Sequence, residues 1–260
     1  SMAGIELNFS EVERKGLKHD RRWMLVDETG RFLSQREFPK LALLQPSIAG
    51  NQLVITDKTE ALDDISIEIK EPDTQPISVT VWDDTFMAKP LHSEVNEWFS
   101  KALESPVRMV FMHAESKRIA DQRYAPKPDD MVSFADGYPI LGISQESLNL
   151  LCEKLGYEIP MNRFRPNIVF EGLSPNEEDT LAEIIINKLK LHGVKPCARC
   201  TITTIDQHTA QKGKEPLTTL STYRKIDHKI LFGENFIPAE SGVLKVGDEV
   251  LVLRRKKPLV

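Results

Sequence analysis

The sequence predicts an α+β fold in which β-strands dominate and helices flank them. Short apolar stretches with a period of two residues recur in the first 90 residues and in the last hundred, separated by turn residues. Only two segments, at 93–103 and 144–155, show clear helical apolar periodicity. Regular short strands joined by turns are typical of a barrel or a sandwich, and 260 residues suffice for one large domain or two small ones.

The N-terminal part is expected to be mostly strands. A hairpin is indicated by Trp23-Met24-Leu25-Val26, followed by the turn residues 27–30 and the run from Arg31 to Ser34. Apolar residues then recur at every second position, which predicts further strands at 53–55, 65–69 and 77–81.

Two helices are expected next. Ser93 is a capping residue ahead of an apolar face that includes Trp98 and Phe99, and Pro106 ends that segment. A strand at 107–111 follows. The second helix, 144–155, has Ser144 as N-cap and Gly156 as its left-handed end.

The last hundred residues return to strand character. Strands are expected at 167–170, 189–191 and 202–205, and two more around a Gly-Asp turn within 243–253. The polar segment 112–130 is typical of a linker, so we expect domains at 1–115 and 116–260. The basic run 254–257 is expected to be a solvated tail.

Composition excludes several classes of protein. A net charge of −5 gives no general attraction for nucleic acid or an anionic membrane surface. No apolar stretch has the roughly 18 residues that a membrane span requires, and the first residues lack the features of a secretion signal. With three cysteines, the chain suits a reducing compartment, and we expect a cytoplasmic protein.

The segment Lys195-Pro196-Cys197-Ala198-Arg199-Cys200 contains a CxxC motif beside a guanidinium, which favours a thiolate. A structural zinc site would need two further ligands, and no histidine lies at ligand spacing. A thioredoxin-like pair would need a following helix, whereas the next residues are β-branched. Two further interpretations of the motif stay open. One is a soft metal held by a single thiolate and a cofactor, and the other is an inert, buried pair of cysteines.

Basic residues gather in two further places, Asp20-Arg21-Arg22-Trp23 with Arg36, and Asn162-Arg163-Phe164-Arg165-Pro166-Asn167. The forked guanidinium group of arginine binds phosphate oxygens well. Several such groups in a protein that is acidic overall are what a pocket for a small anionic cofactor requires. Phosphate-binding loops, dinucleotide fingerprints, GxSxG and HExxH motifs are absent.

These segments together resemble the MOSC family, named for the C-terminal domain of molybdenum cofactor sulfurase. The resemblance covers the following segments, in family order: Gly16-Leu17 through Asp20-Arg21-Arg22-Trp23 to Val26, then Ser34 to Pro39, Arg163 to Val169, Pro196 to Cys200, and Leu244-Lys245-Val246-Gly247-Asp248. It implies a MOSC β-barrel with flanking helices, preceded by a β-barrel-like N-terminal domain. The pattern is similar to that of the mitochondrial amidoxime-reducing components and their bacterial counterparts.

The resemblance also implies site residues. Cys200 would be the catalytic residue and the protein ligand to molybdenum, with Cys197 a neighbour and not a ligand. The residues implied to bind the molybdenum cofactor, a molybdenum pyranopterin, are Ser1, Arg21, Arg36, Gly137, Tyr138, Arg165, Asn167 and Arg199. Gly137 and Tyr138 replace smaller hydroxyl residues of the family, so main-chain contacts are implied there. Asp206 is a plausible acceptor near the site.

The implied activity is that of a molybdenum-dependent oxidoreductase that removes oxygen from N-hydroxylated substrates such as amidoximes and hydroxylamines. Electrons would come from a separate ferredoxin-like or cytochrome-like protein with its reductase. The alternative is a protein that carries molybdenum cofactor, or its sulfur, without turnover, and a third is persulfide handling by both thiols. Pyridoxal phosphate binding is a further property attributed to the family.

Overall fold

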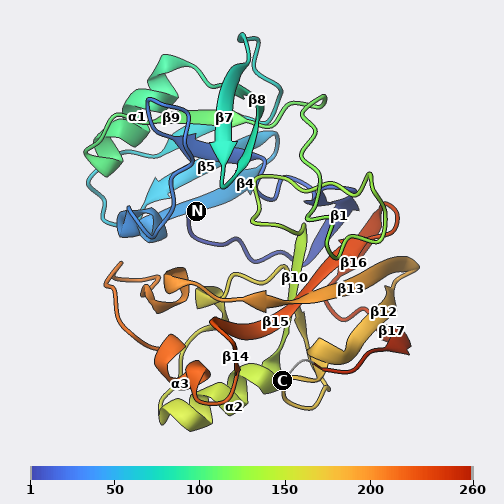
Figure 1. The fold of residues 1–260 in the computed structure, drawn as a ribbon. Helices are drawn as coiled ribbons and strands as arrows, with labels where there is room; N and C mark the ends of the chain where they lie inside the picture. Colours follow the sequence, from blue (N-terminus) through green and yellow to red (C-terminus); the bar gives the residue numbers. More distant parts are fainter. Residues whose placement is uncertain (1, 259–260) are drawn as a thin grey trace. The chain divides into compact units, whose positions relative to one another are not determined.

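A computed structural model describes residues 2–258, which fall into two compact units (Figure 1). Within the described residues, unit 1 comprises 2–6, 21–118 and 205–212, and unit 2 comprises 7–20, 119–204 and 213–258. Each unit therefore includes a short segment from a distant part of the sequence.

Unit 1 contains two small antiparallel sheets and one helix. One sheet has the order β3-β9-β8-β7 and the other the order β4-β5-β6. The elements are β3 (Trp23–Val26), 3-10 helix η1 (Pro39–Leu43), β4 (Leu44–Ala49), β5 (Gln52–Asp57), β6 (Ile65–Glu68), β7 (Ile77–Val81), β8 (Asp84–Pro90), α1 (Ser93–Leu103) and β9 (Arg108–Phe111). The inward residues of these strands and Phe99 of α1 form one apolar core.

Unit 2 is built on a curled seven-stranded sheet of order β11-β10-β15-β13-β12-β17, with β14 paired to β15, and a small sheet β16-β1-β2. The strands are β1 (Phe9–Glu13), β2 (Gly16–Leu17), β10 (Ile140–Ser144), β11 (Ile168–Phe170), β12 (Leu181–Ile186), β13 (Leu189–Ala198), β14 (Lys225–Ile226), β15 (Lys229–Pro238), β16 (Gly242–Lys245) and β17 (Val250–Arg255). Its helices are α2 (Gln145–Leu155), 3-10 helices η2 (Met161–Arg163), η3 (Glu177–Thr180) and η4 (Thr201–Thr204), and α3 (Leu217–Ser221). The strand-rich fold with flanking helices that the sequence predicted is confirmed.

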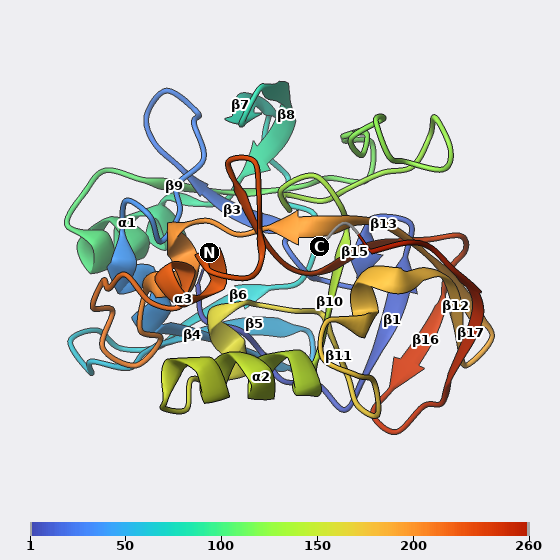
Figure 2. The same cartoon turned by 60° about the horizontal axis from the view of Figure 1, so that its bottom comes forward.

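The predicted helix from Ser144 is confirmed, and its cap explains where it begins. The Ser144 side chain accepts a hydrogen bond from the Ser147 N–H, and Gly156 ends the helix in the left-handed conformation. In Figure 2, α2 lies at the front and leads directly out of β10. Its apolar face packs into a buried cluster with Phe164 and Phe232. None of the helices in the described residues is long and apolar enough to cross a membrane.

Two local expectations for strands need correction. The hairpin turn after β3 forms, but its second arm is not a full strand: Phe32 makes an isolated antiparallel bridge to Val26, and Arg31 makes a parallel bridge to Thr80. The strand expected at 202–205 is wrong, since 201–204 form η4. The Thr203 and Thr204 hydroxyls donate to the carbonyls of Cys200 (3.0 Å) and Thr201 (2.8 Å), which stabilises a tight turn instead.

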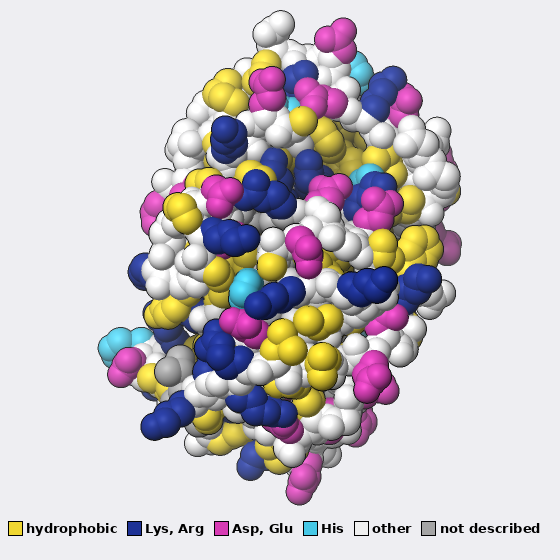
Figure 3. All heavy atoms as spheres, turned by 90° about the vertical axis from the view of Figure 1, so that its right-hand side faces the viewer, with side chains coloured by type: hydrophobic (Ala, Val, Ile, Leu, Met, Phe, Trp, Pro, Cys, Tyr) yellow, Lys and Arg dark blue, Asp and Glu magenta, His cyan; other side chains and the backbone are white. Residues whose placement is uncertain are grey.

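The C-terminal basic residues were expected to form a solvated tail; Arg254 and Arg255 are indeed exposed, but they lie in β17, so the expectation of a tail is wrong for them. β17 pairs with β12, and this pairing brings the basic side chains beside acidic ones. Arg254 pairs with Glu183 (3.1 Å), Arg255 with Glu177 (2.6 Å) and Lys256 with Glu234 (2.5 Å). On the face of the molecule in Figure 3, basic and acidic side chains are likewise interspersed.

Candidate functional site

The CxxC motif lies where β13 ends and η4 begins. Arg199 N–H donates to the Ile230 carbonyl (2.7 Å), so the chain is still held to β15 at this residue. One residue later, the Cys200 carbonyl accepts hydrogen bonds from the Thr203 N–H (3.2 Å) and hydroxyl (3.0 Å). The backbone of Cys200 is therefore fixed on both sides, while its side chain is partly exposed.

The three cysteines form no disulfide, and they differ in environment. Cys152 is buried on α2, where burial raises the pKa of its thiol. Cys197 and Cys200 are both partly exposed. Within residues 2–258, no three Cys, His, Asp or Glu side chains are grouped so that they could hold a metal ion. A metal at Cys200 would therefore need most of its ligands from a cofactor.

Arg199 points inward and joins two segments of unit 2. Its Nη1 donates to Cys197 Sγ (3.0 Å), and its Nη2 donates to the Phe164 carbonyl (2.7 Å). The guanidinium also lies 5.6 Å from the centre of the Phe164 ring. Its Nε is buried and has no hydrogen-bond partner within the described residues. One donor of Arg199 is thus left for a group that the protein does not supply.

The second predicted basic segment follows η2. Phe164 is fully buried against Phe232, with 4.6 Å between ring centres, and anchors the segment in the core. Arg165 has a φ of +58°, a left-handed conformation that costs a non-glycine residue about 1 kcal/mol. The proline that follows, Pro166, leads into β11.

The Asn167 amide is occupied by the protein itself. Its Oδ1 accepts the Leu141 N–H (3.0 Å), and its Nδ2 donates to Asp20 Oδ2 (2.9 Å). Asp20 directly precedes Arg21 in the sequence. The side chain of Asn167 therefore fixes the position of Asp20 in unit 2, and no local sequence pattern predicts this contact.

Gly137 and Tyr138 lie in the loop before β10. The Gly137 carbonyl accepts the Asp121 N–H (3.2 Å), and the Tyr138 ring is buried beside Ala120 and Ile237. Burial raises the pKa of Tyr138. A Cβ at position 137 would meet only an ordinary contact at 3.8 Å, so the turn does not require glycine.

Two predicted cofactor residues belong to unit 1. Arg21 has a φ of +51°, and the Arg36 guanidinium lies 4.5 Å from the centre of the Trp82 ring and 5.6 Å from that of Phe32. The Arg36 carbonyl accepts a hydrogen bond from Lys212 Nζ (2.8 Å). Ser1 lies outside the described residues.

Asp206, also in unit 1, stabilises a turn. Its Oδ1 accepts the N–H groups of His208 (2.9 Å) and Thr209 (2.9 Å). This carboxylate oxygen thus has a local structural task.

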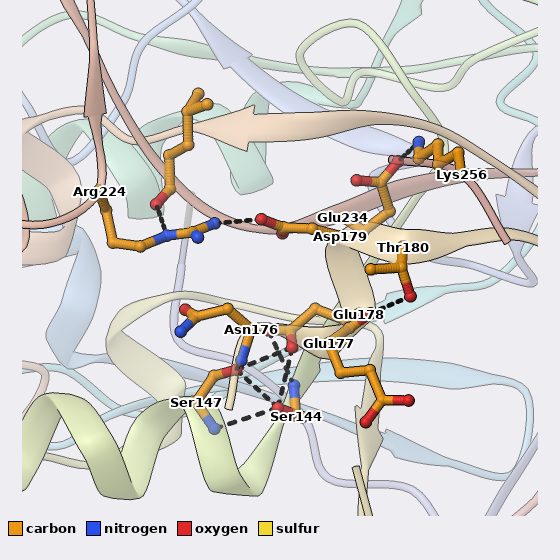
Figure 4. Close-up of polar contacts among 11 residues, drawn as sticks. Ser144, Ser147, Asn176, Glu177, Glu178, Asp179, Thr180, Arg224, Glu234 and Lys256 are labelled. Carbon is orange, nitrogen blue, oxygen red and sulfur yellow. Dashed lines mark hydrogen bonds and ion pairs between the residues drawn. The ribbon is translucent and has the colours of Figure 1, made fainter. Parts of the chain in front are cut away.

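A buried charge cluster in unit 2 was not predicted, and Figure 4 shows it. Arg224 donates to Asp179 and, through Nε, to the Leu231 carbonyl (3.0 Å). Lys256 Nζ lies 2.5 Å from Glu234 Oε1. It also donates to the Gly193 carbonyl (3.1 Å). Asp179 Oδ1 and Glu234 Oε2 are buried without a partner within the described residues. In the sequence, the acidic run at 177–179 is typical of an exposed turn, and for this reason the buried cluster was missed.

Close by, Glu178 is fully buried and accepts the hydroxyls of Ser144 (2.9 Å) and Ser147 (2.8 Å). Its burial raises its pKa, and these two hydroxyls oppose the shift. Glu178 thereby links η3 to the beginning of α2.

The residues of unit 2 fit a molybdenum pyranopterin. Cys200 offers one soft thiolate in a fixed backbone position, which suits a metal whose other ligands come from the cofactor. The buried, unpartnered Nε of Arg199 is one residue away and suits an anionic or carbonyl acceptor.

Comparison with known proteins gives a consistent set of matches. Residues 1–106 match the MOSC N-terminal beta barrel domain, and residues 129–251 match the MOSC domain. The chain is 31% identical to rat mitochondrial amidoxime reducing component 2, over 96% of this chain and 79% of that protein. It is 29% identical to human mitochondrial amidoxime-reducing component 1, over 97% of this chain and 80% of that protein.

Solved structures match only in part. The crystal structure of YiiM from Geobacillus stearothermophilus is 18% identical, with a TM-score of 0.35 over 45% of this chain and 55% of that one.

Proposed function

Because the chain belongs to the MOSC-domain family that includes the mitochondrial amidoxime-reducing components, we propose that it reduces N-hydroxylated compounds with a molybdenum cofactor. The substrate class is that of amidoximes and hydroxylamines. The overall change adds two electrons and two protons to an N–OH group and releases water, leaving an amidine or an amine.

The observation that carries this proposal is the position of Cys200. Its backbone is fixed by hydrogen bonds at Arg199 and Thr203, and its sulfur is partly exposed. When bound, the cofactor would supply a metal that changes oxidation state by two electrons and takes up an oxygen atom. The task of Cys200 is to hold that metal through one thiolate.

The other residues of unit 2 would bind and orient the cofactor. Arg165 is suited to phosphate oxygens, and Arg199 Nε to an acceptor on the pterin. Asn167 would act by fixing Leu141 and Asp20, since both ends of its amide are occupied. Gly137 and Tyr138 would contribute main-chain groups. The roles of Arg21 and Arg36 in unit 1 stay predictions.

Electrons are assigned to a separate ferredoxin-like or cytochrome-like protein with its reductase. Among residues 2–258, no three Cys, His, Asp or Glu side chains are grouped as an iron–sulfur cluster would require. The cytoplasmic location expected from the sequence stays a prediction, because the two relatives named above are mitochondrial.

The test is metal and pterin analysis of the protein made in a host that synthesises molybdenum cofactor. Wild type should contain molybdenum and pterin at close to one equivalent, and Cys200→Ser should lose the metal. Cys152→Ala is the matched control, because that cysteine is buried on α2 and should not affect metal content. Wild type without molybdenum would overturn the proposal.

Turnover is tested with an aromatic amidoxime and a chemical electron donor. The molybdenum-containing protein should form the amidine, and Cys200→Ser should not. Protein that binds the cofactor, exchanges it readily with other enzymes and forms no amidine would be a carrier, and the reductase proposal would then be wrong.

A further inference from the structure

We propose that Cys197 and Arg199 form a brace that positions Arg165 and Cys200, so that Cys197 acts as a hydrogen-bond acceptor and neither as a metal ligand nor as a redox thiol. This inference rests on the proposed function, because it assigns a positioning role at the same cofactor site. Both residues belong to unit 2, and every contact in the argument lies within that unit.

The brace begins at the sulfur of Cys197. Arg199 Nη1 donates to Cys197 Sγ at 3.0 Å, a short contact for a nitrogen and a sulfur atom. Cys197 also packs against the apolar cluster that contains Phe164 and Phe232, so its side chain is anchored. An anchored acceptor at Nη1, together with a second acceptor at Nη2, fixes the guanidinium plane, because the arginine fork is planar and rigid.

The other end of the guanidinium controls the peptide before Arg165. Arg199 Nη2 donates to the Phe164 carbonyl at 2.7 Å, which holds the plane of the 164–165 peptide bond. That plane is one of the two that the φ torsion of Arg165 relates, and this φ is +58°. Because this conformation is unfavourable for a side chain other than glycine, it persists only while its surroundings impose it. Without the brace, residue 165 would relax and its guanidinium would move.

The same residue positions the proposed metal ligand. Arg199 immediately precedes Cys200, and its N–H is held by the Ile230 carbonyl. The main chain and two guanidinium nitrogens of Arg199 are therefore all fixed, at 2.7–3.0 Å. One rigid side chain, that of Arg199, therefore positions both the thiolate ligand and the phosphate-binding arginine before the cofactor binds.

The brace makes different predictions for conservative and non-conservative variants. Cys197→Ser keeps an acceptor, whereas Cys197→Ala removes it. Arg199→Lys keeps the charge but cannot donate to two acceptors through a rigid fork. Phe232→Leu is the control, because it loosens the same core without removing either hydrogen bond.

The first readout is release of pterin from the molybdenum-loaded protein, together with the melting temperature. Cys197→Ala and Arg199→Lys should release pterin roughly tenfold faster than wild type or more, as expected for a lost hydrogen bond to a charged group. Cys197→Ser should stay close to wild type. The inference would be overturned if the rate of pterin release depended only on the melting temperature, so that Phe232→Leu released pterin as fast as Cys197→Ala.

The second readout uses the protein without cofactor. Amide hydrogen exchange in 161–167 should be faster in Cys197→Ala than in wild type and restored in Cys197→Ser. Unchanged exchange in Cys197→Ala refutes the brace itself. Wild type that binds no molybdenum refutes the proposed function, and the positioning role with it, whatever the exchange rates. If Cys197→Ser and Cys197→Ala release pterin equally fast, the thiol itself is required, and the role of Cys197 as a simple hydrogen-bond acceptor is wrong.

Discussion

Replacing Glu234 by Gln should change how the free energy of unfolding depends on pH. Glu234 is fully buried on β15, and burial raises its pKa to about 8, although the Lys256 ammonium, 2.5 Å from Oε1, opposes the shift. Gln has nearly the same shape, keeps an oxygen to which Lys256 can donate, and does not ionise.

The sign and size follow from proton linkage. The folded state binds the Glu234 proton more tightly than the unfolded state, in which the pKa is 4.5. Between pH 4.5 and 8, the wild type therefore loses stability as pH rises, by up to about 1.4 kcal/mol per pH unit. From pH 5 to pH 7.5 the loss from this group is on the order of 3 kcal/mol, and the Gln variant should lack it.

Urea unfolding followed by tryptophan fluorescence, at several pH values between 5 and 7.5, measures this effect. The quantity of interest is the stability of Glu234→Gln minus that of wild type, because most other titrating groups cancel in the difference. This difference should increase with pH. Glu183→Gln is the control: Lys190 and Arg254 lower the pKa of the partly buried Glu183 to about 2, so its own difference should be flat in this range. A flat curve for Glu234→Gln would refute the reasoning.

Two further substitutions test the buried parts of unit 2. Arg224→Met should lower the free energy of unfolding by about 3–5 kcal/mol, because it leaves the buried Asp179 carboxylate without its cation. The midpoint of urea unfolding measures this loss. Adding Asp179→Asn to the same chain should recover part of it. Gly193→Ala should prevent folding of the sheet, since its Cβ would lie 1.7 Å from the Leu181 carbonyl oxygen; native circular dichroism and a wild-type melting temperature in this variant would contradict that expectation.

Sequence patterns predicted elements whose signals are local. The α2 helix was predictable because its cap, its apolar face and its terminal glycine all lie within 13 residues, from Ser144 to Gly156. The turn at 201–204 was not, because threonine favours strands by shape, while its hydroxyl can bond to nearby carbonyls and favour a turn. Which tendency prevails depends on the chain around it.

The candidate site, too, was predictable from the sequence only where its signals are local. The motifs identified Cys200, Arg165 and Arg199, but not what their side chains contact. Asn167 and Asp20 are 147 residues apart, and no local pattern indicates such a pair. The ion pairs of the basic residues 254–256 were not predicted, because their acidic partners come from η3, β12 and β15, which only the folded sheet brings near.

The division of the chain into interleaved units has a consequence for its synthesis. Gln35, fully buried in unit 1, exchanges amide hydrogen bonds with Gln207 at 3.0 and 3.3 Å. In unit 2, β1 near the N-terminus pairs with β16, at 242–245. A ribosome that has made the first 118 residues has therefore completed neither unit. The nascent chain must therefore keep Gln35 without Gln207 and one edge of β1 without β16 until residues 207 and 242–245 have been made, so neither unit can complete its fold before then.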